Sequence, residues 1–206
     1  MNIKLFGSKF TMKFSDDWVI LGKNPEFPET STIIQKDTDN SINMVVMYPF
    51  EKSKAMPFDN IDVIIENEHN QLFDDQGLIE VNTGKENFKY VYVIIKELRE
   101  NGNQYILNLH CEIENKYYCI IGFFQEYGIT GTRETAVFEQ CRRNNVVTID
   151  ENTNKINGWN YDPYDKNFNK GHLMNLSEQI SLDEYFPNHP LSQCRLFIKE
   201  FIENKI

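Results

Sequence analysis

Cys119 and His110 are the two side chains in this sequence whose types and placement best suit nucleophilic chemistry. A histidine that removes the proton of a cysteine leaves a reactive thiolate. The strand pattern described below places the two residues opposite each other on one face of a sheet, with Glu112 and Asn108 close by. Catalytic groups usually lie on loops or at strand ends. We therefore favour a buried thiol beside a histidine with satisfied hydrogen bonds, and a cysteine-dependent enzyme is the alternative.

Two acidic stretches have the residue types of a cation site but are explained better as turns. The segment from Asp150 to Asn154 matches the opening of a calcium loop, Asp-x-Asn-x-Asn. Lys155 stands where such a loop needs glycine, and Tyr161 stands where it needs its closing glutamate. The acidic pair at positions 37 and 39 lies between two apolar runs, as in a hairpin turn. The sequence therefore predicts no metal ion and no cofactor.

The composition is that of a folded, acidic protein. Of its 206 residues, 40% are hydrophobic and 13% aromatic, and the formal net charge is −10. Nucleic acid and anionic membranes would repel such a surface, and the basic pair Arg142-Arg143 is explained by its place at a predicted helix end. No apolar run suits a signal peptide or a membrane span. We therefore expect a cytoplasmic protein. The four cysteines lack CxxC spacing, and we expect their thiols to be reduced.

The stretch from residue 88 to residue 125 contains three apolar runs separated by two turn signals, which indicates consecutive antiparallel strands. Asn101 and Gly102 are expected at the centre of a type I′ turn, and Glu114 and Asn115 at the second turn. The pairs predicted across the first turn are Leu98 with Tyr105, Ile94 with Leu109 and Tyr92 with Cys111. Those across the second are Cys111 with Tyr118, Leu109 with Ile120 and Tyr105 with Phe124.

Side chains alternate between the two faces of a strand, so these pairs assign each residue to a face. The first face collects Tyr90, Tyr92, Ile94, Leu98, Tyr105, Leu107, Leu109, Cys111, Ile113, Tyr118, Ile120 and Phe124. The second face collects Val91, Val93, Ile95, Ile106, His110, Tyr117, Cys119, Ile121 and Phe123. Because both faces are largely apolar, something is expected to cover each. The second face is the more polar, and we expect its cover to be partial.

The rest of the chain must supply the elements that complete and cover this sheet. Strands are expected over residues 10–14, 18–21, 32–36, 42–48 and 78–83. A helix over residues 61–73, capped by Asp59 or Asn60, has an apolar stripe for one face and carries His69 on its wet side. A second helix, from Thr132 to about Arg143, is expected to cover the sheet as well.

Pro190 opens a last predicted helix, which runs to about residue 204 and has a clear apolar side. The residues on that side are Leu191, Cys194, Ile198, Phe201 and Ile202. We expect this helix to pack on the edge of the protein's own sheet, and an interface with another chain is the alternative.

The composition changes at Asn144, where a segment rich in asparagine and aspartate begins. It carries isolated aromatic residues, Trp159, Tyr161, Tyr164 and Phe168, which are candidates for an interface with a partner or for pinning the tail to its own domain. The predicted organisation is one domain over residues 1–144. Residues 145–206 form an irregular linker and a C-terminal amphipathic helix that is packed on or beside that domain.

The order of elements from residue 10 to residue 143, about two thirds of the chain, resembles the PsbP-like fold. The residues that carry the resemblance are Phe10-Thr11-Met12-Lys13-Phe14 with Trp18, the helix over 61–73 and the meander over 90–124. This fold, an α/β/α sandwich, occurs in an extrinsic photosystem II subunit, a Ran-binding nuclear import factor and small bacterial proteins, including chaperones for secreted toxins. The resemblance implies an α+β class, with an antiparallel β-sheet flanked by helices, and a non-enzymatic role. It implies no functional residue, because the family shares no catalytic motif.

The expected function is a protein-binding module of a chaperone or adaptor kind, with another polypeptide as its partner. Neither nucleic acid nor a membrane is an expected partner. The alternatives are a small-ligand pocket on the second face, near His110 and Tyr117, and the enzyme that would use Cys119.

Overall fold

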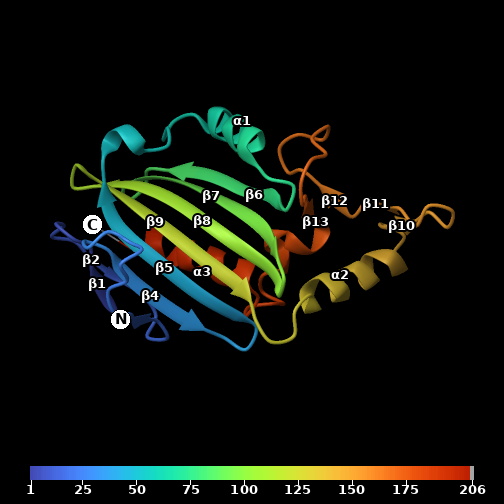
Figure 1. The fold of residues 1–206 in the computed structure, drawn as a ribbon, viewed down its shortest axis with the longest axis horizontal. Coiled ribbons are helices and arrows are strands. Elements are labelled where there is room, and N and C mark those ends of the chain that lie inside the picture. The colour runs from blue at the N-terminus through green and yellow to red at the C-terminus, as the bar shows by residue number, and fades with distance from the viewer. Residues whose placement is uncertain (205–206) are drawn as a thin grey trace.

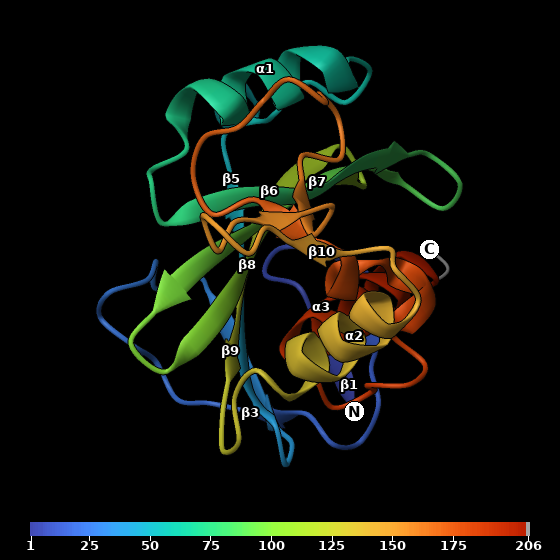
Figure 2. The same cartoon turned by 90° about the vertical axis from the view of Figure 1, so that its right-hand side faces the viewer.

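The computed structural model describes residues 1–204 and shows an α+β protein built on a seven-stranded antiparallel sheet. The strand order is β3-β4-β5-β9-β8-β7-β6, and helices lie on both faces (Figures 1 and 2). The strands are β3 (Val19–Ile20), β4 (Thr32–Asp37), β5 (Ser41–Phe50), β6 (Gln76–Gly84), β7 (Lys89–Arg99), β8 (Gly102–Ile113) and β9 (Lys116–Glu126). The helices are α1 (Ile61–Gln71), α2 (Thr132–Arg143) and α3 (Pro190–Ile202).

Shorter elements precede the sheet and fill the tail. The N-terminal pair is β1 (Asn2–Lys4) with β2 (Thr11–Lys13). The tail contains two further pairs, β10 (Thr148–Ile149) with β11 (Ile156–Asn157), and β12 (Asn160–Tyr161) with β13 (Met174–Asn175). Single 3₁₀ turns are η1 (Lys52–Lys54), η2 (Leu176–Glu178) and η3 (Ile180–Leu182).

The second turn of the meander has the predicted register. Glu114 and Asn115 both have positive φ, as a type I′ turn requires. All three predicted pairs across this turn are confirmed, and His110 lies opposite Cys119. The two central strands therefore present their side chains to the faces that the sequence predicts.

The first turn differs from the prediction by two residues. Leu98 pairs with Asn103, and the loop consists of Glu100 and Asn101. Gly102 has a φ of +100°, whereas neither loop residue has positive φ, which is the pattern of a type I turn followed by a glycine bulge. A shift of two residues preserves the faces, because side chains alternate with a period of two.

The first face forms the main core. Its central side chains, Tyr105, Leu107, Leu109, Tyr118, Ile120 and Phe124, are all no more than 1% exposed. The N-terminal pair β1–β2 adds Ile3, Met12 and other apolar residues to the same cluster. Leu98 is the exception among the residues assigned to this face, because it lies near the end of its strand and is 51% exposed.

Helix α3 covers the middle of the first face and not the edge of the sheet, which corrects the prediction for this helix. It contacts β5, β8 and β9, and it lies behind these strands in Figure 1. Phe197 stacks on Phe14 with ring centroids 5.5 Å apart and also packs against Trp18. The residues that α3 buries are Leu191, Cys194, Phe197, Ile198 and Phe201.

Helix α1 covers one face of the sheet, as predicted, and the structure shows that this is part of the second face. Its N-terminus is capped by Asn60, whose Oδ1 accepts a hydrogen bond from the Val63 amide at 3.2 Å. Ile64 packs with side chains of β6 and β7, among them Val81 and Val91. Figure 1 shows no helix in front of β8 and β9. The cover of this face is therefore partial.

Helix α2 does not cover the sheet, so the prediction for this helix is wrong. It extends beyond the ends of the strands in Figure 1 and packs against the tail. Val137 and Phe138 form a separate cluster with Trp159 and with apolar residues of η2 and η3. Because Trp159 and its neighbours offer an apolar surface outside the sheet, the stripe of α2 is buried there.

A buried ion pair fastens the tail to the main core. Lys96 on β7 and Glu178 on η2 are both inaccessible, with Nζ and Oε2 2.9 Å apart. Lys96 also donates to the Leu173 carbonyl, and the Tyr105 hydroxyl donates to Glu178 Oε1 at 2.7 Å. Burial raises the pKa of Tyr105 well above its usual value, so the hydroxyl keeps its proton.

Replacing Glu178 with alanine is expected to lower the free energy of unfolding by about 3–5 kcal/mol, because the Lys96 charge would remain buried without its partner. The matched control is Glu184→Ala, since Glu184 is exposed a few residues away and should change stability by no more than about 0.5 kcal/mol. Denaturant unfolding measures both. A loss at Glu178 as small as that of the control would contradict the anchoring role.

Candidate functional site

His110 and Cys119 lie opposite each other, but their surroundings keep both neutral. His110 Nδ1 accepts a hydrogen bond from the Met56 amide at 2.9 Å, and its ring packs on Phe50. Burial lowers the pKa of His110 to about 4 and raises the pKa of the Cys119 thiol. Cys119 Sγ lies 4.0 Å from Asn108 Oδ1. A neutral imidazole committed to a backbone amide does not generate a thiolate, so the geometry favours a structural role.

The four tail aromatics contact this chain's own residues. Trp159 is only 5% exposed and packs edge-on against Phe138, so its indole is not available to a partner. Tyr161 is partly buried against the main core. The candidate interface is thus pinned in place at these two positions.

Tyr164 and Phe168 hold the tail against the edge of the sheet and against α1. The Tyr164 hydroxyl accepts a hydrogen bond from the Val81 amide and donates one to the Val81 carbonyl on edge strand β6. Phe168 stacks on His69, whose Nε2 lies 2.9 Å from Asp162 Oδ2. His69 therefore belongs to a contact with the tail and is not a free surface residue. Satisfying the polar groups of an edge strand in this way blocks its pairing with other chains.

Carboxylates of the two acidic turns contact groups of their own turn or of the adjoining strand. Asp37 accepts hydrogen bonds from Gln35 Nε2. Asp150 Oδ1 accepts hydrogen bonds from the amides of Asn152 and Thr153, which lower the pKa of its carboxyl. No group of three histidine, cysteine, aspartate or glutamate residues with metal-binding geometry occurs within residues 1–204. The Asp150 segment is the turn between β10 and β11.

A charged network around α3 was not predicted from the sequence. Arg133 of α2 is 1% exposed, and Asp183 receives hydrogen bonds from both Arg133 and Arg195. Arg195 also donates to Glu80 Oε2 at 2.8 Å, and the Tyr92 hydroxyl donates to the other oxygen of Glu80. These residues lie far apart in the sequence, and no local pattern marks them as partners. The network ties α2, α3 and β6 together.

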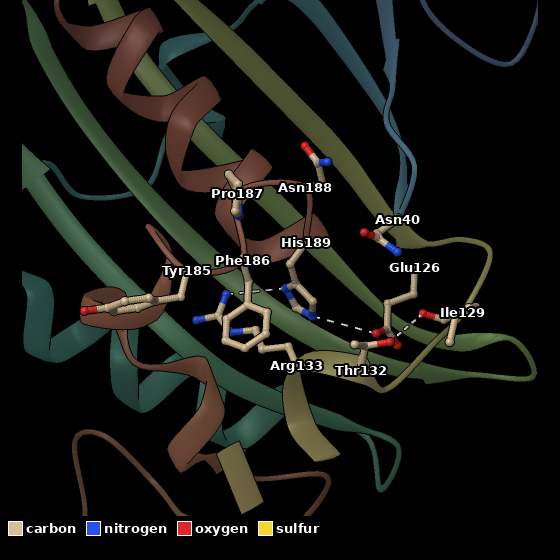
Figure 3. Close-up of a pocket in the computed structure, with 10 residues that line it drawn as sticks. All are labelled: Asn40, Glu126, Ile129, Thr132, Arg133, Tyr185, Phe186, Pro187, Asn188 and His189. Carbon is tan, nitrogen blue, oxygen red and sulfur yellow. Dashed lines mark hydrogen bonds and ion pairs between the residues drawn. The ribbon is translucent and has the colours of Figure 1, made fainter. Parts of the chain in front are cut away.

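A cavity of about 150 Å³ opens beside this network, between the start of α2 and the start of α3 (Figure 3). His189 Nδ1 accepts a hydrogen bond from the Leu191 amide, and burial lowers the pKa of His189 well below its usual value. The ring is therefore neutral, with its proton on Nε2. That atom faces Glu126 Oε1 at 3.7 Å, which is too long for a direct hydrogen bond.

Four apolar side chains of the second face lie outside the cluster that α1 covers. We call the surface that they form the open face and define it by Met44, Ile106, Ile121 and Phe123. Phe123 pairs with Met44 on one side and with Ile106 on the other, and Ile121 lies two residues along the same strand. All four side chains are half-buried, and none belongs to any of the three apolar clusters in residues 1–204. The sequence placed three of them on this face and predicted that its cover would be partial, but it did not indicate which residues stay uncovered.

The stability of the protein should fall at acidic pH because of His110. Its pKa is about 4 in the folded protein and near 6.5 in the unfolded chain, so the unfolded state binds the proton first as the pH falls. Between about pH 7 and pH 4.5 this difference should cost about 2–3 kcal/mol of unfolding free energy.

The matched control is His110→Asn, which retains an oxygen acceptor for the Met56 amide and does not titrate. The stability advantage of the natural protein over this variant should shrink as the pH falls through this range. Chemical denaturation at several pH values measures the difference. Parallel pH profiles for the two proteins would contradict the buried, neutral assignment of His110.

No helix in residues 1–204 is both long enough and apolar enough to cross a bilayer. A scan against models of known protein families found no match, and a search of the curated proteins also found none.

Proposed function

We propose that this protein is a non-enzymatic polypeptide-binding module whose binding surface is the open face. One observation carries the proposal: Met44, Ile106, Ile121 and Phe123 are neighbours on three paired strands, are only half-buried and belong to none of the three apolar clusters in residues 1–204. An apolar patch of this kind on a folded domain is typical of a protein–protein interaction site. The neutral states of His110 and Cys119 also favour binding over catalysis.

The PsbP-like assignment and a cytoplasmic location are part of the same proposal. The order of strands, hairpin, helix and meander supports the fold assignment, as do the helices on both faces of the sheet. Helix α2 lies outside the layers of the sheet and its covering helices, so the structure matches the PsbP-like sandwich less fully than the order of elements in the sequence does. The four cysteines are free thiols, which is typical of a reducing compartment.

Point variants test the proposal better than removal of the tail. A chain ending at Arg143 would lose five buried side chains of α3 from the main core. Each such side chain contributes about 1.5–3 kcal/mol when buried, and the total stability of a domain is only about 5–15 kcal/mol. Loss of partner capture by that truncated chain would therefore report unfolding.

We expect Ile121→Asn and Phe123→Ser to reduce the capture of partner polypeptides by about tenfold or more, because each removes apolar contact at the centre of the open face. The matched control is Ile180→Asn, since Ile180 is 67% exposed on η3. Affinity capture from a cell lysate with quantitative mass spectrometry compares the variants, after thermal melts have established that all are folded. Equal recovery of the same polypeptides by every variant would contradict the proposal.

Binding of a small polar ligand is a second candidate, favoured by the gap between His189 and Glu126 (Figure 3). The Nε2 proton of His189 needs a hydrogen-bond acceptor. Glu126 Oε1 accepts one hydrogen bond from the Gly131 amide and can accept a second. A primary amide group offers both functions on adjacent atoms. The cavity is large enough for one small molecule of this class.

Acetamide is the simplest probe of this second candidate. It should raise the melting temperature of the natural protein in a concentration-dependent manner, and His189→Asn should abolish the shift. The asparagine retains the cap of α3 but removes the donor that faces Glu126. An equal shift in both proteins, or none in either, would rule out amide binding at this position.

A further inference from the structure

The layer of helix on the second face is incomplete by about one helix. Neighbouring strands lie about 4.8 Å apart, and packed helices lie about 8–10 Å apart, so one helix covers about two strands. Helix α1 packs over β6 and β7. The next position in the same layer therefore lies over β8 and β9. Phe50 and Met56 already contact His110 there, and the open face lies further along the same two strands. A helix is the occupant whose dimensions fit this place.

The segment that contains α1 is strongly acidic. From residue 55 to residue 84 the sequence has seven aspartate or glutamate residues and no lysine or arginine. Glu80 pairs with Arg195, but the other six, Asp59, Asp62, Glu66, Glu68, Asp74 and Asp75, form no ion pair within residues 1–204. An occupant placed next to α1 would therefore gain from carrying positive charge.

Among these carboxylates, Glu68 is the one that lies on the side of α1 facing the sheet. It follows Ile64 by four residues and precedes Leu72 by four, so it lies on the side of α1 that faces the sheet. The residue is half-buried, and no side chain or amide within residues 1–204 donates to its carboxylate. Burial raises the pKa of Glu68 above its usual value because no cation offsets the loss of water.

We propose that the open face binds an amphipathic helix of another polypeptide, which lies beside α1 and carries lysine or arginine along the flank that meets Glu68. This inference rests on the proposed polypeptide-binding function and names its partner class. The apolar side of the helix packs on Ile106, Ile121 and Phe123. Its basic side chains reach Glu68. A second copy of this chain fits less well, because each copy has a formal charge of −10 and the same acidic helix at this surface.

Two synthetic amphipathic peptides test the inference. One has leucine on one face and lysine on the other over about 18 residues, five helical turns, and its partner has glutamate at every lysine position. Fluorescence anisotropy of the labelled peptides measures binding at low and high salt. We expect the lysine peptide to bind at least about tenfold more tightly than the glutamate peptide, and to weaken as salt is added.

Three variants locate the peptide. Ile121→Asn should weaken binding of the lysine peptide by about tenfold or more, as a central apolar contact would. Glu68→Gln should weaken it about three- to tenfold and reduce its salt dependence. The matched control is Glu66→Gln on the same helix, because Glu66 faces the groove between α1 and residues 164–170. It should change the affinity by less than about twofold.

The outcomes separate this inference from the function on which it rests. If both peptides bind equally and Ile121→Asn weakens both, the open face binds polypeptide but the basic partner is wrong. If neither peptide binds while the open-face variants lose captured polypeptides from lysate, the helical partner is wrong and the binding function stands. If the lysine peptide binds and Ile121→Asn has no effect, the peptide lies elsewhere on the acidic surface and the open face has failed as the site.

Discussion

The arrangement of this chain depends on the buried ion pair between Lys96 and Glu178, because that pair fixes where the tail returns to the sheet. Lys96 lies on a strand within the main core, and a charge in that position needs a partner that replaces water. Glu178 supplies it from a position 82 residues along the chain, in the tail before α3. Helix α3 begins soon afterwards and lies across the middle of the same face. The charged groups thus determine the path, and the apolar helix supplies most of the buried area.

The positions of the three helices explain why one face of the sheet is fully covered and the other is only partly covered. Helix α3 and the β1–β2 pair fill the first face. On the second face α1 covers two strands, and α2, which was expected to extend that cover, packs on Trp159 and other residues of the tail. The cluster around Trp159 gives the long tail a core of its own. It also leaves the open face without a cover from the described residues.

Local features of the fold could be predicted from the sequence, and distant ones could not. The turn at Glu114 and Asn115 determined its register, because two consecutive residues with positive φ permit little else. The strand register across the turn before Gly102 differed from the prediction by two residues. An Asn-Gly pair also suits a type I turn followed by a glycine bulge, which moves the loop one residue towards the N-terminus. The networks of Glu178, Asp183 and Arg195 lay outside any local pattern. Their partners come from sequence positions 50 to 115 residues away or from neighbouring tail residues.

The same networks determine what kind of surface a partner meets. Lys96, Arg133 and Arg195 are enclosed with Glu178, Asp183 and Glu80, so these three cations do not offset any carboxylate outside. The acidic excess of the sequence is therefore carried by the surface, and six carboxylates on and around α1 form no ion pair within residues 1–204. The open face lies next to α1, and its apolar side chains are on paired strands. Such strands lose little conformational entropy when a partner binds. Apolar contact with the open face supplies affinity. The carboxylates around α1 favour a positively charged partner and speed its association.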